Sequence, residues 1–446
     1  MKHGSCVVVL CASLLSACDN GHTQTALEQD TGPTPVLSEP HSSLIPTVDI
    51  APAVGWPAQG KPVAAAGFAV NAFANGLQHP RTVYVLPNGD VLIAETNAPP
   101  KPDDGKGIKG AVMKSVMKKA GAGVPSANRI TLLRDADGDG VAETRSVFLQ
   151  NLNSPFGIVL VGDSLYVANT DAVVRVPYRD GETSISAAPV KVADLPAGTL
   201  NHHWTKSLAA SADGKHLYVG VGSNSNVGEN GMANEVDRAA VLEIDVATGA
   251  RRVFASGLRN PTALAWQPHD AKLWVVVNER DELGNDLVPD YLTSVRPGAF
   301  YGFPYSYYGQ HVDTRVKPQD PALVARAIPP DYALGSHVAP LGLAFYTGDA
   351  LPPRFRNGAF IGLHGSWNRK PLSGYKVVFV PFNEGAPSGP LETVLDGFVN
   401  DKGDAQGRPV GVAQDRAGAL LIADDVGNTI WRLTAAPATA QAQAKP

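Results

Sequence analysis

The sequence predicts an all-β fold, a six-bladed β-propeller with loop insertions. Six times along the chain an apolar stretch meets a turn and continues as an alternating strand, starting near positions 85, 160, 209, 266, 354 and 413. The 45 glycines and 36 prolines show no collagen-like period, which favours many short strands joined by tight turns. Amphipathic helices do not alternate with these strands, and this argues against a doubly wound sheet.

The N-terminus has the features of a bacterial lipoprotein signal peptide, which we assign to residues 1–18. An apolar run too short to span a bilayer leads to Leu15-Ser16-Ala17-Cys18, which resembles the lipoprotein box in which Cys18 is lipidated. An ordinary cleaved signal with an incidental cysteine is the alternative. We expect a periplasmic protein that is anchored through Cys18 to the inner or the outer membrane. All three cysteines lie in this segment, so we expect no disulfide and no cysteine metal site in the folded domain.

Composition divides the rest of the chain into three parts. Residues 19–60 are rich in Pro, Ser, Thr and Gln and are expected to form a flexible tether. Residues 61–434 are expected to form the propeller, with a lysine-rich insertion at 97–128 that includes a possible helix near 109–120, and an aromatic-rich insertion at 286–330. Residues 435–446 are expected to be disordered.

The net charge of -5 argues against nucleic acid as a partner.

The residues just before each repeat predict a ligand pocket. In a propeller these positions lie in the loops that enter the innermost strands, and the loops of all blades converge on one face near the axis. They supply His203, Arg259, Asn260, His337 and Arg408, with Arg81 as a weaker member. Such a basic cavity suits a small anion with carboxylates, because arginine can grip a carboxylate bidentately. For any single arginine, stabilisation of a blade through a local acid is the alternative.

His203 is the candidate general base of this pocket. It precedes a strand-turn-strand unit with a strand at 216–221, which would hold it rigidly at the mouth of the propeller. An unperturbed imidazole titrates close to neutral pH, as proton abstraction requires. The alternative is a structural histidine whose hydrogen bonds are satisfied.

Two acidic stretches are candidate calcium sites. The first has carboxylates at alternate positions and Gly140 at the sixth place, which resembles the start of a calcium loop; its candidate ligands are Asp135, Asp137, Asp139 and Glu143. Its twelfth position is Ser146, so a plain acidic turn is the alternative, and any ion here would be structural. The second stretch, 278–286, follows a predicted strand at 273–277 and would bring carbonyls and acids to the edge of the pocket.

Several segments together carry a resemblance to a known family. They are the stretch 198–231 around His202 and His203, GLRNPTALAW from Gly257, NERDELGNDL from Asn278, HVAPLGLAFYTG from His337, HGSWNR from His364 and GRPVGVA from Gly407. In these segments the chain resembles the L-sorbosone dehydrogenase-like family. That family is similar to the soluble glucose, aldose sugar and fungal pyranose dehydrogenases. The resemblance implies a six-bladed propeller that uses pyrroloquinoline quinone (PQQ) and Ca²⁺.

The resemblance also implies roles for individual residues. His203 matches the base that removes a hydroxyl proton while a hydride passes to the quinone. Of the other positions, Arg259 and Asn260 match residues beneath the cofactor, His337 a polar cofactor contact, Arg408 a carboxylate-binding arginine and Arg369 a nearby lysine, while Glu279 and Arg280 match residues whose carbonyls bind Ca²⁺, and Trp367 is a candidate substrate contact. The aspartate that orients the base in the glucose enzymes falls on Ser223 or Asn224 here, so Glu229 or Glu235 would have to substitute.

The expected function is therefore oxidation of a sugar or a related alcohol or aldehyde, with a quinone or a cytochrome as possible electron acceptors. A propeller lactonase with metal-activated water is one alternative, and it would need carboxylates and asparagines around an axial metal. A non-catalytic binding propeller is another, and it would not need histidine and arginine at equivalent blade entries.

Overall fold

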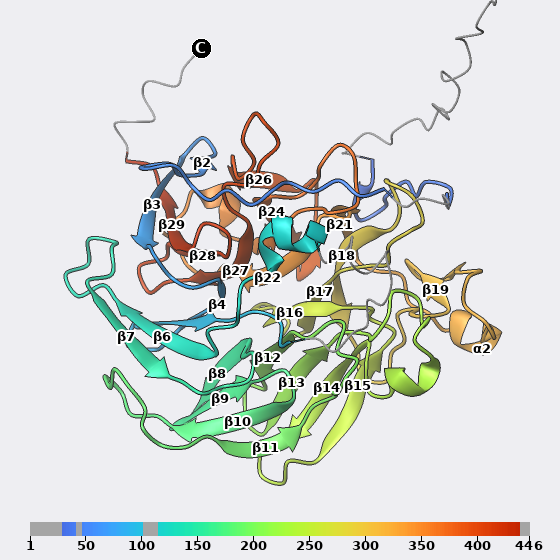
Figure 1. The fold of residues 1–446 in the computed structure, drawn as a ribbon, viewed down its shortest axis with the longest axis horizontal. Coiled ribbons are helices and arrows are strands. Elements are labelled where there is room, and N and C mark those ends of the chain that lie inside the picture. The colour runs from blue at the N-terminus through green and yellow to red at the C-terminus, as the bar shows by residue number, and fades with distance from the viewer. Residues whose placement is uncertain (1–28, 42–46, 101–114, 438–446) are drawn as a thin grey trace, which may run out of the picture.

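The computed structural model describes residues 29–41, 47–100 and 115–437. Six antiparallel sheets stand around a central axis, so the predicted six-bladed propeller is confirmed (Figure 1). The innermost strands of neighbouring blades pack against one another in a closed ring. No helix among the described residues is long and apolar enough to cross a bilayer.

Blades 1 to 3 are meanders in which each strand pairs with the next along the chain. Blade 1 contains β4 (Pro80–Val85), β5 (Val91–Glu95), β6 (Arg129–Arg134) and β7 (Thr144–Leu149); blade 2 contains β8 (Gly157–Val161), β9 (Ser164–Ala168), β10 (Ala172–Pro177) and β11 (Val190–Asp194); blade 3 contains β12 (Lys206–Ala210), β13 (His216–Val221), β14 (Ala240–Asp245) and β15 (Arg251–Ser256).

Blades 4 to 6 carry additions to this pattern. Blade 4 contains β16 (Pro261–Trp266), β17 (Leu273–Val277), β18 (Pro289–Val295) and β21 (Tyr332–Ser336); blade 5 contains β22 (Pro340–Phe345), β23 (Gly358–Leu363), β24 (Lys376–Asn383) and β26 (Glu392–Asp396); blade 6 contains β27 (Pro409–Gln414), β28 (Leu420–Asp424), β29 (Thr429–Ala435) and β3 (Phe68–Ala74). Because β3 precedes blade 1 in the sequence, its pairing with β29 closes the ring.

The remaining elements are short. Strand β1 (Thr31–Gly32) extends blade 4, β2 (Val63–Ala64) and β25 (Ala386–Pro387) join blade 5, and β19 (Ser306–Tyr307) pairs with β20 (His311–Val312) in an insertion. The helical turns described are η1 (Lys118–Ala122), η2 (Met232–Glu235), α2 (Pro321–Val324) and η3 (Pro353–Phe355).

Six apolar clusters fill the six interfaces between neighbouring blades. The alternation in β13 shows how they form: Leu217 and Val219 pack against blade 2, whereas Tyr218 packs against blade 4. Both faces of such a strand are buried, so a central strand such as β17 is apolar at every position. Period-two patterning therefore decides which interface each side chain fills.

The structure differs from the expected tether in residues 29–41 and 47–60. Asp30 is buried and accepts a hydrogen bond from the backbone N–H of Ser336 (2.7 Å), and Ala51 is buried in the core between blades 5 and 6. Trp56 Nε1 donates to Asp424 (2.7 Å). In Figure 1 this blue segment runs along the top of the propeller, near β21, β24 and β2. Single contacts of this kind leave no periodic pattern, which is why composition alone indicated a tether. Residues 1–28 and 438–446 lie outside the described residues.

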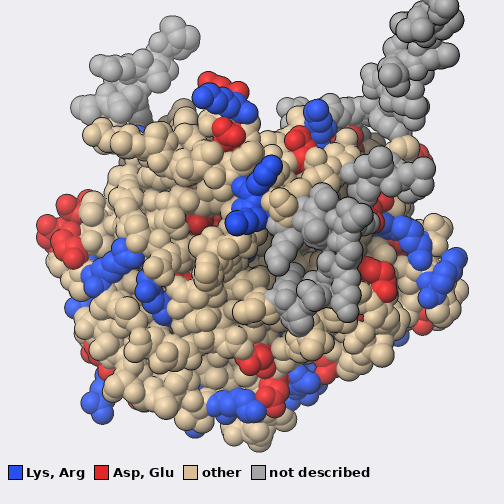
Figure 2. Space-filling model, in the orientation of Figure 1, with Lys and Arg blue, Asp and Glu red and all other residues tan. Residues whose placement is uncertain are grey.

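The structure describes the second insertion in full and the first insertion in part. Residues 101–114 lie outside the described residues. Of the possible helix near 109–120, residues 115–117 are helical and lead into η1 at 118–122, where the Lys119 carbonyl accepts a hydrogen bond from the Ala53 N–H (2.8 Å). In the second insertion, Tyr301 and Tyr307 are buried against blades 3 and 4. Charged side chains of both signs are interspersed over the face seen in Figure 2, whereas Arg259 and Arg408 are buried.

Candidate active site

The candidate site lies where the chain enters the innermost strands. His203 precedes β12, Arg259 and Asn260 precede β16, His337 precedes β22, and Arg408 precedes β27. These strands are neighbours around the axis, so their entry loops face one another across its end. Hydrogen bonds and ion pairs join these residues into two networks, one around Asp281 and one around Asp425. His203 lies beside the Asp281 network.

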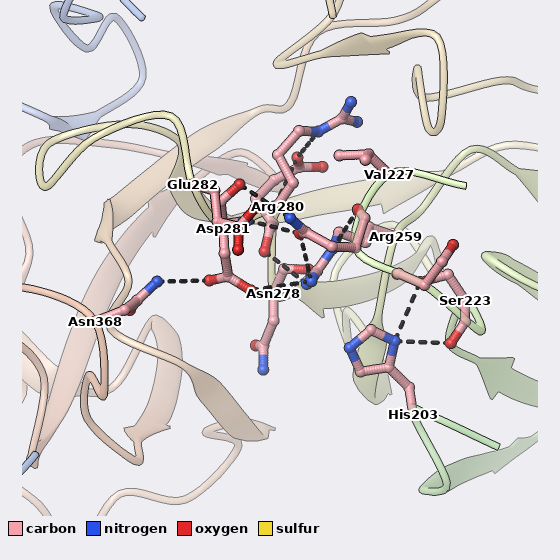
Figure 3. A network of polar contacts seen from close by, with 12 residues as sticks. His203, Ser223, Val227, Arg259, Asn278, Arg280, Asp281, Glu282 and Asn368 are labelled. Atoms are coloured by element: carbon pink, nitrogen blue, oxygen red, sulfur yellow. Dashed lines mark hydrogen bonds and ion pairs between the residues drawn. The ribbon is translucent and has the colours of Figure 1, made fainter. Parts of the chain in front are cut away.

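His203 is held by Ser223. Its Nδ1 lies 2.8 Å from the Ser223 carbonyl oxygen and 3.1 Å from Ser223 Oγ, and that hydroxyl donates to the Ser225 carbonyl (2.6 Å). A carbonyl only accepts hydrogen bonds, so the imidazole carries its proton on Nδ1 and its lone pair on Nε2. Figure 3 shows Nε2 on the side of the ring away from Ser223. The geometry is that of a base with a fixed tautomer.

The two glutamates that were expected to orient His203 are engaged elsewhere. Glu235 accepts from the Asn224 N–H at 2.9 and 3.1 Å and from the Ser225 hydroxyl. Glu229 accepts from the N–H groups of Asn226 (2.8 Å) and Val227 (2.7 Å). Both carboxylates therefore shape the loop after β13, and the Ser223 carbonyl takes the orienting place for which Glu229 or Glu235 was expected.

Gly222 explains how His203 and Asn260 come so close to β13. A Cβ atom at this position would lie 2.4 Å from both His203 Cβ and Asn260 Oδ1. Any larger residue would push these two side chains apart. The Asn260 Oδ1 atom is buried and has no hydrogen-bond partner among the described residues.

Arg259 spends all five of its N–H donors on the protein. Nε donates to the Asn226 carbonyl (3.1 Å), Nη1 to the carbonyls of Asn278 (3.4 Å) and Glu279 (2.7 Å), and Nη2 to Asn226 Oδ1 (2.9 Å) and Asp281 Oδ2 (3.1 Å). The guanidinium thus ties the loop after β13 to the loop after β17. In this state Arg259 offers a ligand its flat face and not its donors.

Asp281 joins Arg259 to His337 and Asn368. The Asn368 amide donates to Asp281 Oδ1 (2.8 Å), and His337 Nδ1 lies 3.6 Å from the same oxygen (Figure 3 shows the Asn368 contact). Burial works against both charges, yet the pKa of His337 is raised by the hydrogen bond and charge of Asp281, and the pKa of Asp281 is lowered by His337 and Arg259. Sequence reasoning missed Asp281 and Asn368, although both lie in the motifs that it singled out.

Asp290 lies behind this network. Its two carboxylate oxygens accept from the N–H groups of Glu279 and Ala339, each at 2.7 Å, and so link the loops after β17 and β21. Burial raises the pKa of Asp290 to about 7. The carboxyl group therefore fixes the N–H side of Glu279, the residue whose carbonyl was predicted to bind Ca²⁺.

A second network surrounds Asp425, at the end of β28. Arg81 Nη1 donates to Asp425 Oδ2 (2.6 Å), His364 Nε2 lies 3.0 Å from the same oxygen, and His79 Nδ1 lies 3.1 Å from the Asp425 carbonyl. The Asp425 N–H donates to the Arg408 carbonyl (3.3 Å). Sequence reasoning named Arg81 and Arg408 but missed Asp425 and His364.

Arg408 is the arginine best placed to bind an anion. Its guanidinium stacks on Tyr375 (4.9 Å to the ring centre), and Nη2 donates to Tyr375 Oη (3.1 Å) and the Ala51 carbonyl (3.4 Å). Among the described residues it forms no ion pair within 4 Å, and its buried Nε has no partner. A buried cation with an unused donor fits a ligand carboxylate.

Two other arginines with predicted roles serve the framework. Arg369 Nη2 donates to Asp286 (2.7 Å) in a buried ion pair, and Nη1 donates to the carbonyl of Ser336, the residue before His337 (3.2 Å). The Arg280 side chain pairs with Glu279 (3.1 Å) and Asp313 (3.0 Å) and is fully buried. The Arg369 Nε is buried without a partner among the described residues, and its expected cofactor role stays a prediction, as does the binding of an ion by the carbonyls of Glu279 and Arg280.

Trp367, the candidate substrate contact, is half-buried, and its carbonyl accepts a hydrogen bond from the Asp49 N–H (2.9 Å).

The candidate ligand atoms of Asp135, Asp137, Asp139 and Glu143 all lie within 4.8 Å of one another, in the turn between β6 and β7. The structure thus brings the four carboxylates together, and calcium binding there stays a prediction.

Comparison with known proteins gives a family match over most of the chain. The TrAA12-like family model matches residues 62–436. An uncharacterized protein of Borreliella burgdorferi is 28% identical over 305 residues, which are 66% of this chain and 79% of that protein. A pyrroloquinoline quinone-dependent pyranose dehydrogenase of Coprinopsis cinerea is 40% identical over 72 residues, which are 15% of this chain and only 9% of that protein.

Solved structures share the fold. The holo form of the PQQ domain of the Coprinopsis cinerea pyranose dehydrogenase superposes with a TM-score of 0.66 at 20% identity, covering 85% of this chain and 98% of that one. A Trichoderma reesei protein of carbohydrate-active enzyme family AA12 gives a TM-score of 0.67 at 19% identity, covering 88% and 100%. At these identities the likeness establishes the propeller.

Proposed function

The chain belongs to the TrAA12-like family, and we propose that it is a PQQ-dependent dehydrogenase that oxidises a sugar or a related alcohol or aldehyde. The observation that carries the proposal is His203, an imidazole at the mouth of the propeller whose Nδ1 proton is fixed on the Ser223 carbonyl. The names of the pyranose dehydrogenase and its PQQ domain support the same reaction class.

The described residues fit a quinone that carries carboxylates. Among the described residues, Arg408, Arg81 and Arg369 each have a buried Nε donor without a partner, and Asn260 has a buried amide oxygen without one. Unpaired buried polar atoms are uncommon and indicate a missing polar ligand. In our proposal Arg408 holds a cofactor carboxylate, the flat face of Arg259 lies beneath the cofactor, and Asn260 and His337 supply polar contacts. When bound, PQQ accepts the two electrons of the oxidation as a hydride.

Calcium is proposed at the carbonyls of Glu279 and Arg280. Hard oxygen donors suit this ion, and the second lone pair of the Glu279 carbonyl remains after its bond with Arg259. Asp290 fixes the N–H of Glu279 and Arg259 fixes its carbonyl, so both sides of this residue are held. An ion at this edge would increase the electrophilicity of the quinone.

In this proposal His203 removes the substrate's hydroxyl proton at Nε2. A positioned general base contributes about 10²- to 10⁴-fold to such a step. The half-buried ring of Trp367 offers an apolar face for a sugar. We also propose that the enzyme is held at the cell membrane, on the periplasmic side, through a lipid on Cys18, which lies outside the described residues.

Reconstitution tests the proposal. The apo-protein should reduce an artificial dye in the presence of aldoses only after PQQ and Ca²⁺ are added. His203→Ala should lower turnover at least about 100-fold while PQQ binding, followed by fluorescence quenching, stays within about 3-fold of wild type. Lactone hydrolysis without PQQ, or full turnover in His203→Ala, would contradict it.

A further inference from the structure

His364 is a second imidazole with a fixed proton at the same end of the propeller. It follows β23. Its backbone N–H donates to the carbonyl of Ala339, which lies two residues after His337 in the sequence (2.9 Å). Its Nε2 lies 3.0 and 3.2 Å from the two oxygens of Asp425, which is 1% exposed. Because a carboxylate only accepts, Nε2 carries the proton and Nδ1 carries the lone pair. This tautomer is the reverse of that of His203.

The surroundings keep this imidazole uncharged. Burial lowers the pKa of His364 to about 4, and the nearby guanidinium groups of Arg408 and Arg81 act in the same direction, while Asp425 opposes them. Asp425 is itself shared with Arg81 (2.6 Å) and lies 3.5 Å from His79 Nε2, and its effect on the pKa of His364 does not outweigh that of burial. At neutral pH Nδ1 is therefore a hydrogen-bond acceptor.

Nδ1 of His364 has no hydrogen-bond partner among the described residues, and it is not among the buried atoms that lack a partner. The His364 side chain is 17% exposed. An accessible acceptor with a fixed tautomer can take a hydrogen bond from a ligand, and a hydroxyl group is a neutral donor that fits it.

We propose that His364 accepts a hydrogen bond from a substrate hydroxyl at Nδ1 and so helps to determine specificity for polyhydroxylated substrates. The proposal rests on the proposed sugar oxidation and adds a residue that contacts a hydroxyl other than the one that His203 deprotonates. Arg81 and Asp425 act through His364 as positioning residues: Asp425 fixes the tautomer, and Arg81 holds Asp425. A site built to bond a hydroxyl discriminates strongly against analogues that lack it.

Substrate analogues combined with variants provide the test. Glucose and its monodeoxy analogues are compared in wild type, His364→Leu and His364→Gln, with PQQ and Ca²⁺ saturating. In wild type, removal of the recognised hydroxyl should lower kcat/KM by about 10- to 100-fold, and in His364→Leu the same removal should have little effect. Gln can donate to Asp425 and still offer an oxygen, so His364→Gln should restore part of the discrimination.

A second readout does not depend on turnover. In ¹⁵N NMR spectra of the apo-protein, the His364 ring should show its proton on Nε2 and remain neutral at pH 6, and saturating sugar should shift Nδ1. This arm stays informative if the wild-type protein reduces no dye, which would remove the proposed oxidation but leave sugar binding testable. It also stays informative if His364→Leu fails to fold.

The control is His269→Leu. His269 is exposed in the turn between β16 and β17, so its replacement should leave kcat/KM and PQQ affinity unchanged. A proton on Nδ1 of His364, or a folded His364→Leu protein that retains wild-type discrimination against every deoxy sugar, would overturn the proposal. A purely structural role for the Asp425 network would lower stability in all His364 variants without altering discrimination.

Discussion

Replacing Arg259 with methionine should loosen the apo-protein before any cofactor is involved. The change removes the hydrogen-bond donor from acceptors on two loops. These acceptors are the carbonyls of Asn226, Asn278 and Glu279, and one oxygen of Asp281. Breaking a buried ion pair from one side costs about 3–5 kcal/mol. Asp281 retains Asn368 and His337 as partners, so the expected loss is at the lower end, about 3 kcal/mol.

The assay is urea unfolding of the apo-protein, followed by tryptophan fluorescence. Arg259→Lys keeps the charge beside Asp281 but cannot satisfy five acceptors, so about half of the loss is expected. A double-mutant cycle with Asp281→Asn isolates the ion pair. Arg416→Met, at an exposed arginine that bonds only a surface carbonyl, should change the free energy of unfolding by less than about 0.5 kcal/mol. An Arg259→Met apo-protein as stable as wild type would refute the claim that Arg259 holds the loops together.

Three further predictions concern charge, metal and anchoring. Burial alone would lower the pKa of His337, but Asp281 raises it above 6.5, so the stability from this pair is full below pH 6.5 and falls as the pH rises through the raised value; thermal unfolding between about pH 6 and 9 should show this decline, and His337→Gln should flatten it. Calcium should raise the melting temperature of wild type by more than that of Asp135→Ala/Asp139→Ala, with dye reduction unaffected in the variant; equal shifts would exclude an ion in this loop. Cys18→Ser should move the protein from the membrane fraction to the soluble periplasmic fraction, and retention at the membrane would contradict a lipid anchor.

The strands were predictable because their burial is periodic. The strands expected at 216–221 and 273–277 have these bounds in β13 and β17. Each is covered on both faces by a neighbouring blade, so every apolar position leaves a signal in the sequence. Closure of blade 6 by β3 was not predicted, because pairing between β3 and β29 joins opposite ends of the chain and no local pattern encodes it.

The candidate site was predictable only in part. Loop position identified His203, Arg259 and Arg408, since equivalent loops must converge. It could not tell which polar neighbours a side chain would have: the resemblance implied a cofactor role for Arg369 as for Arg408, yet Arg369 pairs with Asp286 and Asp30.

The segment that crosses blades 5 and 6 bears on where the catalytic unit begins. The family match starts at residue 62, yet the Ala51 carbonyl contacts the Arg408 guanidinium and the Asp49 N–H contacts the Trp367 carbonyl. A shortened protein that starts at the family boundary would keep all six blades and lose part of the wall around its ligand. Recombinant or chimeric versions should therefore retain the segment that contains Asp49 and Ala51.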